Sequence, residues 1–379
     1  MKIVQFITRM DDIGGAQIHL LHLSIGLARR GHHVTVIANE KGPLFDELNQ
    51  NNIACIEIPE LRRTIHPYFD LRALYKIRSV LKQANPHLLA IHSTKAGVIG
   101  RILGQQLKIP TIFTAHGWSF SEGIPERKRR MYIYLERLIG RISQGIITVS
   151  DYDYQLALQH DILPENKLQT IYNGIPDIKR PLSSQRNMGP PTIVMVARFA
   201  YPKDHLTVIK ALEKLGHMRW KLSLVGDGPR LSDMKSIVKK SKISDRVTFM
   251  GAIRHVNQVL NDSDIFVLMS KHEGLPISII EGMRSGLPIV ASNVGGVKEM
   301  VRDNWNGYLI PEGDVDTLAI KLSTLISNQE LMLKMGEFSR KRYEERFTYD
   351  RMFSDTLNYY KKISFPKNQI VLHKREESI

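Results

Sequence analysis

The sequence predicts an α/β protein built from two parallel-sheet units in tandem. Short β-rich runs alternate with stretches whose apolar residues recur at helical spacing, which is typical of strands joined by crossover helices. The strands are nearly continuous apolar runs, as a sheet covered on both faces requires. One segment rich in proline, serine and basic residues, PDIKRPLSSQRNMGPP at 176–191, interrupts this alternation and predicts a linker.

The first series of elements begins at the N-terminus. KIVQFIT predicts a strand, and the following IHLLHLSIGLARRG predicts a helix, with Leu20, Leu23 and Leu27 at helical spacing and Gly31 as its stop. HHVTVIAN predicts the next strand. The alternation then continues at residues 88–93, 96–107, 110–117, 145–150 and 167–175.

The second series starts directly after the linker. We predict strands at 192–198, 221–228, 247–251, 265–270 and 307–313, and helices near 204–215 and 231–242. These limits give a first domain over residues 1–180 and a second over 190–347. Residues 348–363 predict an amphipathic helix, and KNQIVLHKREESI at the end predicts a polar tail.

Length and composition fit a globular protein of two domains. The chain has 379 residues, of which 42% are hydrophobic, and no apolar run approaches the roughly 20 residues of a membrane-spanning helix. The first residues lack the pattern of a signal peptide. Cys55 is the only cysteine, so neither an internal disulfide nor a thiolate metal site is expected. We therefore expect a cytoplasmic protein.

The charge is strongly basic and uneven. Lysine and arginine exceed aspartate and glutamate by 53 − 38 = 15, and residues 51–150 alone hold 15 basic and 6 acidic residues. Such an excess suits a polyanionic partner, namely nucleic acid, an anionic membrane or phosphate groups. Solubility alone is the alternative. No recognised nucleic-acid module is found, so we expect no nucleic-acid partner.

Open parallel sheets bind ligands at the carboxyl ends of their strands. The stretch HEGLPISIIEGMRSGLPIVAS follows one such end and carries Glu273 in a loop before Pro276, the expected first residue of a helix. Free N–H groups around Ile277 and Ser278 would bind phosphate, and Glu281, one turn further, could accept hydrogen bonds from hydroxyl groups. A nucleotide sugar fits this pattern. Alternatively, Glu281 stabilises the helix dipole and Glu273 is a solvated charge.

A basic pair follows the strand TIVMVAR. Arg198 ends this run and Lys203 lies five residues later, so both are expected at one strand end. A guanidinium and an ammonium group together could neutralise a diphosphate without a metal ion. Ordinary surface charge is the alternative. The acidic pair Asp11 and Asp12 is interpreted as solvated, and no metal site is predicted.

Two further strand ends of the second half are weaker candidates. VGDGP places Gly226 and Gly228 directly after a strand, which indicates either a simple turn or a close approach to a nucleotide. VTFMG at 247–251 is a candidate strand for binding the base.

The first half offers a glycine pair and two strand-end side chains. Gly14 and Gly15 let the backbone come close to a ligand at the start of a helix, but they do not form the G-x-G-x-x-G fingerprint, which disfavours a dehydrogenase. His116 follows the strand TIFTA and is either catalytic or structural. Lys95, in HSTKAG, is a candidate contact for an acceptor phosphate.

Residues 125–141, PERKRRMYIYLERLIGR, combine six basic and two acidic residues with Met131, Tyr132, Ile133, Leu135 and Leu138. On a helix this gives an apolar side beside a cationic one, which could lie on an anionic membrane surface. An ordinary packed helix with a solvated basic face is the alternative.

Several features follow one another along nearly the whole chain: GGA after the first strand, His116, Arg198 with Lys203, GDG, and an E-x7-E pair. Together they resemble the retaining, nucleotide-sugar-dependent glycosyltransferases of family four, which have the GT-B fold of two facing Rossmann-like domains. HSTKAG and TAHGWSF are similar to bacterial members that build capsule, exopolysaccharide or O-antigen repeats on a lipid diphosphate. The loop IGGAQIH departs from the GGAE type of many relatives, and this departure concerns the acceptor contact.

The resemblance implies a role for each matching residue of the second domain, which would bind the nucleotide sugar. Arg198 and Lys203 would bind the donor diphosphate as it leaves. Glu281 would hold the ribose hydroxyls and Glu273 the donor sugar. The remaining donor-binding positions would be Leu275, Ile277, Ser278, Gly226 and Gly228.

In the first, acceptor-binding domain, the resemblance implies that His116 lies at the reacting face of the sugar. Gly14 and Gly15 would form a loop near the diphosphate, and the helix at 348–363 would cross back to this domain. The implied activity is retaining, metal-independent transfer of a hexosyl group from a UDP-sugar to a lipid-linked or glycan acceptor, without a cofactor, at the inner face of the cell membrane. An epimerase or hydrolase of the same fold and a nucleic-acid-binding protein are the alternatives.

Overall fold

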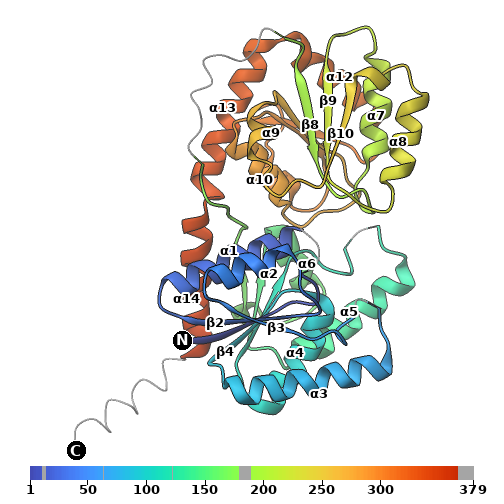
Figure 1. Cartoon of the computed structure of the whole chain (residues 1–379). Coiled ribbons are helices and arrows are strands. Elements are labelled where there is room, and N and C mark those ends of the chain that lie inside the picture. The colour runs from blue at the N-terminus through green and yellow to red at the C-terminus, as the bar shows by residue number, and fades with distance from the viewer. Residues whose placement is uncertain (11–13, 63, 122, 179–188, 366–379) are drawn as a thin grey trace, which may run out of the picture. The chain divides into compact units, whose positions relative to one another are not determined.

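The computed structural model describes residues 1–10, 14–62, 64–121, 123–178 and 189–365 (Figure 1). It divides the chain into two compact units, of which the first is Met1–Asn173 with the segment that begins at Asp350, and the second is Gly174–Tyr349. Each unit contains a parallel sheet with helices, so the predicted α/β fold with two parallel sheets is confirmed.

Three sequence-based predictions concern residues outside these ranges. Most of the predicted linker (179–188), the acidic pair Asp11–Asp12 and the predicted polar tail lie outside the described residues.

The first unit alternates strands and helices from its first residues. Its elements are β1 Lys2–Phe6, α1 Gly15–Arg29, β2 His33–Ala38, α2 Pro43–Gln50, β3 Ala54–Glu57, α3 Pro67–Ala84, β4 Leu88–Ile91, α4 Thr94–Leu107, β5 Thr111–Ala115, α5 Glu126–Gly140, β6 Gly145–Thr148, α6 Asp151–Gln159, a short 3₁₀ turn at Glu165–Lys167, β7 Leu168–Thr170 and, at the other end of the chain, α14 Tyr349–Ser364.

Its seven strands are parallel and run in the order β3-β2-β1-β4-β5-β6-β7. Strands β4, β5 and β6 are buried along their whole length, which explains their continuous apolar sequences. The order reverses between β1 and β4, and a sheet of this type has its ligand-binding crevice at that switch point. The residues just after β1 and β4 are therefore the ones to inspect.

The second unit repeats the pattern with six parallel strands in the order β10-β9-β8-β11-β12-β13, so that its switch point lies between β8 and β11. Its elements are β8 Thr192–Val196, α7 His205–Lys214, β9 Lys221–Val225, α8 Leu231–Lys240, a 3₁₀ turn at Ser244–Arg246, β10 Val247–Gly251, α9 Asn257–Asn261, β11 Ile265–Leu268, α10 Ile277–Arg284, β12 Ile289–Ser292, α11 Val297–Met300, β13 Gly307–Ile310, α12 Val315–Ser327 and α13 Gln329–Arg346.

The sequence analysis did not identify several elements, among them α2, β3 and α3. Strand β3 is at the edge of its sheet and partly exposed along its length, so it lacks a continuous apolar run. Helix α3 exposes Tyr68, Leu71 and Tyr75 to solvent, which blurs the spacing that marks a buried face. A smaller correction concerns Pro276, which caps α10 instead of being its first residue.

The end of the chain returns to the first unit through α14. This helix buries Phe353, Tyr359 and Tyr360, and the Tyr359 hydroxyl donates a hydrogen bond to the carbonyl oxygen of Lys167 at 2.7 Å. A Cβ on Gly145 would lie 2.5 Å from the same hydroxyl oxygen, so a larger residue there would displace the Tyr359 ring. The helix is thus part of the first unit's core.

Candidate functional site

The loops after β8 and β11 meet at the switch point of the second unit. The backbone N–H of Asp204 donates to the carbonyl oxygen of Met269 at 2.9 Å, and that of Lys271 donates to Pro202 at 3.0 Å. Across these loops the ammonium group of Lys203 donates to the carboxylate of Glu273. The two side chains keep 18% and 11% of their surface exposed, so this ion pair is accessible from solvent.

Arg198 belongs to the same strand end. Its side chain is exposed, while the backbone on both sides of it is bound to the neighbouring strand end. The N–H of Ala197 donates to Val225 at 3.0 Å and that of Phe199 donates to Asp227 at 2.9 Å. The backbone around Arg198 is therefore bound to the strand end that carries the GDG turn.

The two glycines of that turn are required by close backbone contact. Gly226 and Gly228 have φ of +141° and +150°, and a Cβ on them would lie 2.1 Å from the carbonyl oxygen of Ala197 and 2.6 Å from that of Phe199. Any side chain here would push the two strand ends apart. The turn thus fixes the backbone around Arg198, a firmer role than the sequence indicated.

A third glycine, Gly295, was missed by the sequence analysis. It follows β12 with φ of +51°, and a Cβ on it would lie 1.9 Å from the carbonyl oxygen of Glu273. The N–H of Gly296 points to the same oxygen at 3.4 Å. The doublet in SNVGGV was a visible signal, and its position directly after a strand would have identified it.

Helix α10 and the loop before it carry the remaining predicted donor contacts. Leu275 and Ile277 are buried, whereas Ser278 in the first turn is partly exposed. An α-helix leaves its first N–H groups without intrahelical acceptors, so this end can accept an anion. Burial raises the pKa of Glu281 to about 7, and the nearby Arg284 guanidinium opposes that rise. This carboxyl group is therefore poised to change its charge near neutral pH.

Arg284 is buried and holds α10 against the start of the unit. It donates to the carbonyl oxygen of Pro176 at 2.8 Å and to the side chain of Asn257. Two more hydrogen bonds hold the same segment. Both terminal nitrogens of Arg340 donate to the Asp177 carboxylate, at 2.7 and 2.6 Å. The described residues at the start of the predicted linker are thus anchored to the second unit.

In the first unit, Gly14 caps α1 and Gly15 begins it, with no side-chain cap. Next to this helix, at the switch point, three histidines form a cluster. His19 lies on α1, His92 directly follows β4 and His116 directly follows β5. The His92 Nδ1 and His116 Nε2 atoms are 3.3 Å apart, and the His92 Nε2 atom is 2.6 Å from the amide oxygen of Gln5.

This contact pattern fixes the protons of the cluster. Since His92 Nε2 donates to the Gln5 oxygen, His92 Nδ1 carries a lone pair and accepts the Nε2–H of His116. Burial lowers the pKa of all three rings, and the neighbouring rings lower the pKa of His92 and His116 further. His116 is therefore held as a neutral imidazole.

The Lys95 side chain, in the first turn of α4, is bound by protein groups. Its ammonium group donates to the carbonyl oxygens of Arg62 at 2.6 Å and Thr64 at 2.8 Å and pairs with the Asp70 carboxylate at 2.5 Å. Three acceptors match its three N–H bonds. In this structure Lys95 ties α4 to the segment before α3, and contact with an acceptor phosphate would require it to exchange one of these partners.

Helix α5 is packed against the first unit on one side and exposes apolar side chains on the other, and its predicted contact with a membrane stays a prediction. Ile133 and Ile139 are buried, and Glu136 forms a buried ion pair with Arg101 of α4 at 2.8 Å. The opposite side exposes three apolar side chains, with 55%, 71% and 50% of their surface accessible: Met131, Tyr134 and Leu138. None of the described helices is both long and apolar enough to span a membrane.

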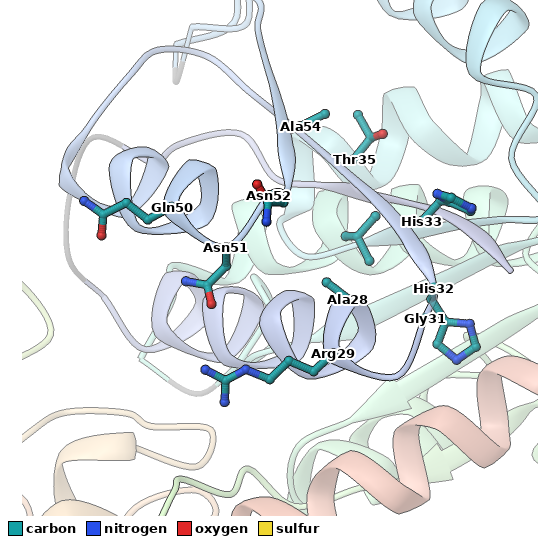
Figure 2. A pocket seen from close by; sticks show the side chains of 11 residues that line it. Ala28, Arg29, Gly31, His32, His33, Thr35, Gln50, Asn51, Asn52 and Ala54 are labelled. Atoms are coloured by element: carbon teal, nitrogen blue, oxygen red, sulfur yellow. The ribbon is translucent and has the colours of Figure 1, made fainter.

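A pocket of the first unit lies away from these residues (Figure 2). It is formed at the carboxyl end of α1 and the amino ends of β2 and β3, opposite to the strand ends that carry His92 and His116. None of the predicted site residues lines it. Its lining residues are Ala28, Arg29, Gly31, His32, His33, Val34, Thr35, Gln50, Asn51, Asn52 and Ala54.

Comparison with known families gives two matches that follow one another along the chain. The family model "Glycosyltransferase Family 4" matches residues 13–178, and the model "Glycosyl transferases group 1" matches residues 179–342. The boundary between the matches lies within the predicted linker.

Curated relatives match over most of the chain. The O-antigen biosynthesis glycosyltransferase WbnH of Escherichia coli is 28% identical over 87% of this chain and 92% of its own. The UDP-Gal:alpha-D-GlcNAc-diphosphoundecaprenol alpha-1,3-galactosyltransferase of the same species is 26% identical over 75% of this chain and 77% of its own. Among solved structures, Anabaena Alr3699/HepE in complex with UDP-glucose superposes with a TM-score of 0.81 at 20% identity, over 94% of this chain and all of the other. This likeness confirms the predicted GT-B fold.

Proposed function

Because the chain belongs to the family four and group 1 glycosyltransferases with the GT-B fold, we propose that it is a retaining, metal-independent hexosyltransferase. It would move a hexose or N-acetylhexosamine from a UDP-sugar to a lipid-linked or glycan acceptor in bacterial surface polysaccharide biosynthesis. The observation that carries this proposal is the accessible Lys203–Glu273 ion pair beside Arg198 at the second unit's switch point. Two cations and a carboxylate there suit a diphosphate linked to a sugar.

The donor diphosphate would bind to Arg198 and Lys203. During transfer the bond between the anomeric carbon and the diphosphate breaks, so negative charge grows on the leaving group. Fixed positive groups aimed at that charge lower the barrier. In this scheme Lys203 exchanges its bond to Glu273 for a phosphate oxygen, and the released carboxylate accepts hydrogen bonds from hydroxyls of the donor sugar.

The start of α10 would hold the other end of the donor. Its first N–H groups would contribute to phosphate binding, and Glu281 would accept hydrogen bonds from the ribose hydroxyls. Arg284 supports this geometry by anchoring the helix to Pro176. The backbone of the GDG turn and of β10 would lie near the nucleotide.

In the first unit, His116 would contact the reacting sugar as a neutral imidazole. Retention would follow from attack on the same face that the diphosphate leaves, with a leaving phosphate oxygen taking the acceptor proton. No protein nucleophile and no cofactor are needed in this scheme. The name of the Escherichia coli galactosyltransferase, which specifies a UDP-sugar and a diphosphoundecaprenol acceptor, supports this choice of donor and acceptor.

A lipid-linked acceptor would bring the enzyme to a membrane surface. The exposed apolar side of α5 is flanked by basic residues that are themselves exposed: Arg127, Lys128, Arg130 and Arg137. An amphipathic helix of this kind binds anionic bilayers both by burying its apolar side chains and by the attraction of its basic side chains to anionic lipids. We propose that α5 makes this contact at the inner face of the cell membrane.

The test is a thermal-shift screen with UDP-, GDP- and ADP-sugars, followed by product analysis with lipid-diphosphate acceptors. We expect stabilisation by a UDP-sugar, and a glycosylated lipid whose new linkage keeps the anomeric configuration of the donor. Consumption of the donor without any acceptor would indicate an epimerase or hydrolase instead. Failure of every nucleotide sugar to bind would refute the proposal.

A further inference from the structure

The cluster of His19, His92 and His116 has more ligand capacity than the proposed role of His116 uses. One ring nitrogen of each histidine lies within 4.8 Å of one from both others, and no other such grouping of potential metal ligands occurs in the described parts of the chain. His19 and His92 are almost completely buried, with 4% and 2% of their surface accessible. His116 is partly exposed and gives access from solvent.

We propose that His19, His92 and His116 form a binding site for a borderline-soft divalent transition metal such as Zn²⁺, with water as the fourth ligand. Imidazole nitrogens bind Zn²⁺ at about 2.0–2.1 Å in tetrahedral sites, which places neighbouring ligand atoms about 3.3–3.4 Å apart. His92 Nδ1 and His116 Nε2 already have this separation, at 3.3 Å. The third ring has to close by at most 4.8 − 3.3 = 1.5 Å.

Groups outside the cluster support metal binding. Ligating histidines usually donate their other ring N–H to a carbonyl or carboxylate oxygen. The bond from His92 Nε2 to the Gln5 amide oxygen has this arrangement and directs the Nδ1 lone pair into the cluster. The Nδ1 atom of His19 is buried without a hydrogen-bond partner among the described residues. Buried polar atoms normally have a bonding partner, and a bound ion would provide one for this ring.

The hydrogen bonds also leave a ring nitrogen available to a metal. A metal binds the neutral imidazole, and His92, whose Nε2 donates to Gln5, presents its Nδ1 lone pair to the cluster. Binding requires only that the Nε2 proton of His116 move to Nδ1 of the same ring. The ring stays neutral, and no net proton is released.

Occupancy would have a consequence that rests on the proposed function. A metal held by His116 takes the ring nitrogen away from the sugar, so the ion would inhibit transfer. This separates the site from the metal-independent chemistry proposed above. Metal binding itself does not depend on that chemistry and can be measured without any substrate.

The test uses the full chain without a histidine tag. Co²⁺ titration should give the visible bands of a four-coordinate site, and calorimetry should show one Zn²⁺ per chain. His92→Gln and His19→Gln, which keep a polar side chain of similar size, should each weaken binding about tenfold or more, and Gln5→Leu about tenfold. The control His217→Gln removes an exposed histidine of the second unit and should change nothing.

The matched variants distinguish this cluster from an adventitious surface site, because metal binding should depend on His19 and His92 and not on His217. Equal affinity in the wild type and both histidine variants, with all three folded by circular dichroism, would overturn the proposal. Metal binding without inhibition would leave the site intact but would contradict the role of His116 in transfer.

Discussion

Two ion pairs, one from each unit, lie in opposite environments. In the first unit Arg101 and Glu136 have 0% and 3% of their side chains exposed, and the histidine cluster of the same unit is neutral. In the second unit Lys203 and Glu273 lie in the accessible loops at the carboxyl ends of the strands, next to backbone turns that contain glycine. Buried pairs are fixed in one arrangement, whereas an accessible pair can exchange partners with a ligand. We therefore expect the charged groups of the second unit to stabilise the charge that develops during the reaction.

The largest effect is expected from Arg101→Met, which tests how much stability depends on a buried ion pair. Removing one partner of a buried ion pair leaves the Glu136 charge in the core, which costs about 3–5 kcal/mol of unfolding free energy. Arg130→Met, on the exposed Arg130–Glu126 pair of α5, is the control and should cost less than about 0.5 kcal/mol. Urea unfolding measures both. Equal losses would mean that burial does not distinguish the two pairs.

The next largest effect concerns the accessible pair. Lys203→Ala should lower turnover about 100-fold or more, because a preorganised charge at the leaving group is lost, while the unfolding free energy changes little. Lys271→Ala, in the exposed Lys271–Glu312 pair, should keep its activity. Steady-state kinetics with the donor found by the screen provides the measurement. A wild-type rate for Lys203→Ala in folded protein would remove this residue from the site.

The backbone behind the pair can be tested through Gly295→Ala. The new Cβ would meet the Glu273 carbonyl oxygen at 1.9 Å in a left-handed conformation, so we expect a loss of about 3 kcal/mol and weaker donor binding. Gly313→Ala has a similar φ of +70° but open space around it, and it should show only the conformational cost of about 1 kcal/mol. The difference between the two variants isolates the contact with Glu273. If they lose stability equally, that contact does not constrain the loop.

The same contrast explains how much the sequence could predict. In the second unit each candidate follows its own strand, so Arg198, Lys203 and Glu273 could be named from short motifs, and the switch point then brings them together. Both parallel sheets were predictable for the same reason, since buried strands are continuous apolar runs. Edge strand β3 was not, because its side chains are partly exposed.

In the first unit the important grouping is not local in sequence. His19, His92 and His116 come from three elements that only the sheet order places together, so the sequence identified His116 alone. The partners of Lys95 were hidden for a similar reason, since two of them are backbone carbonyl oxygens. Backbone acceptors and long-range clusters have no motif, and they require the fold to be known.

A substitution of Glu281 tests whether burial of a carboxyl group in the second unit makes the free energy of unfolding depend on pH. Its folded pKa of about 7 lies above the ordinary value of 4.5, so the folded state binds the proton more tightly. The wild type should therefore lose stability relative to Glu281→Gln as pH rises from about 4.5 to about 7, by about 2–3 kcal/mol. Denaturant unfolding across this range measures the difference. A constant difference between the two proteins would show that the carboxyl group titrates normally.

The smallest effect is expected at the outer surface of α5. Tyr134→Glu replaces an aromatic side chain, 71% exposed, by a negative charge beside the basic residues of this helix. Binding to vesicles with anionic lipid at low salt should fall about fivefold, which corresponds to about 1 kcal/mol, the value of one charge near such a surface. Ile320→Glu, at an equally prominent apolar side chain of the second unit (63% exposed), is the matched control and should leave binding nearly unchanged. Sedimentation of both variants decides whether membrane contact belongs to the first unit alone. Equal losses would assign it to net charge, and no sedimentation of the wild type would remove the proposed membrane contact.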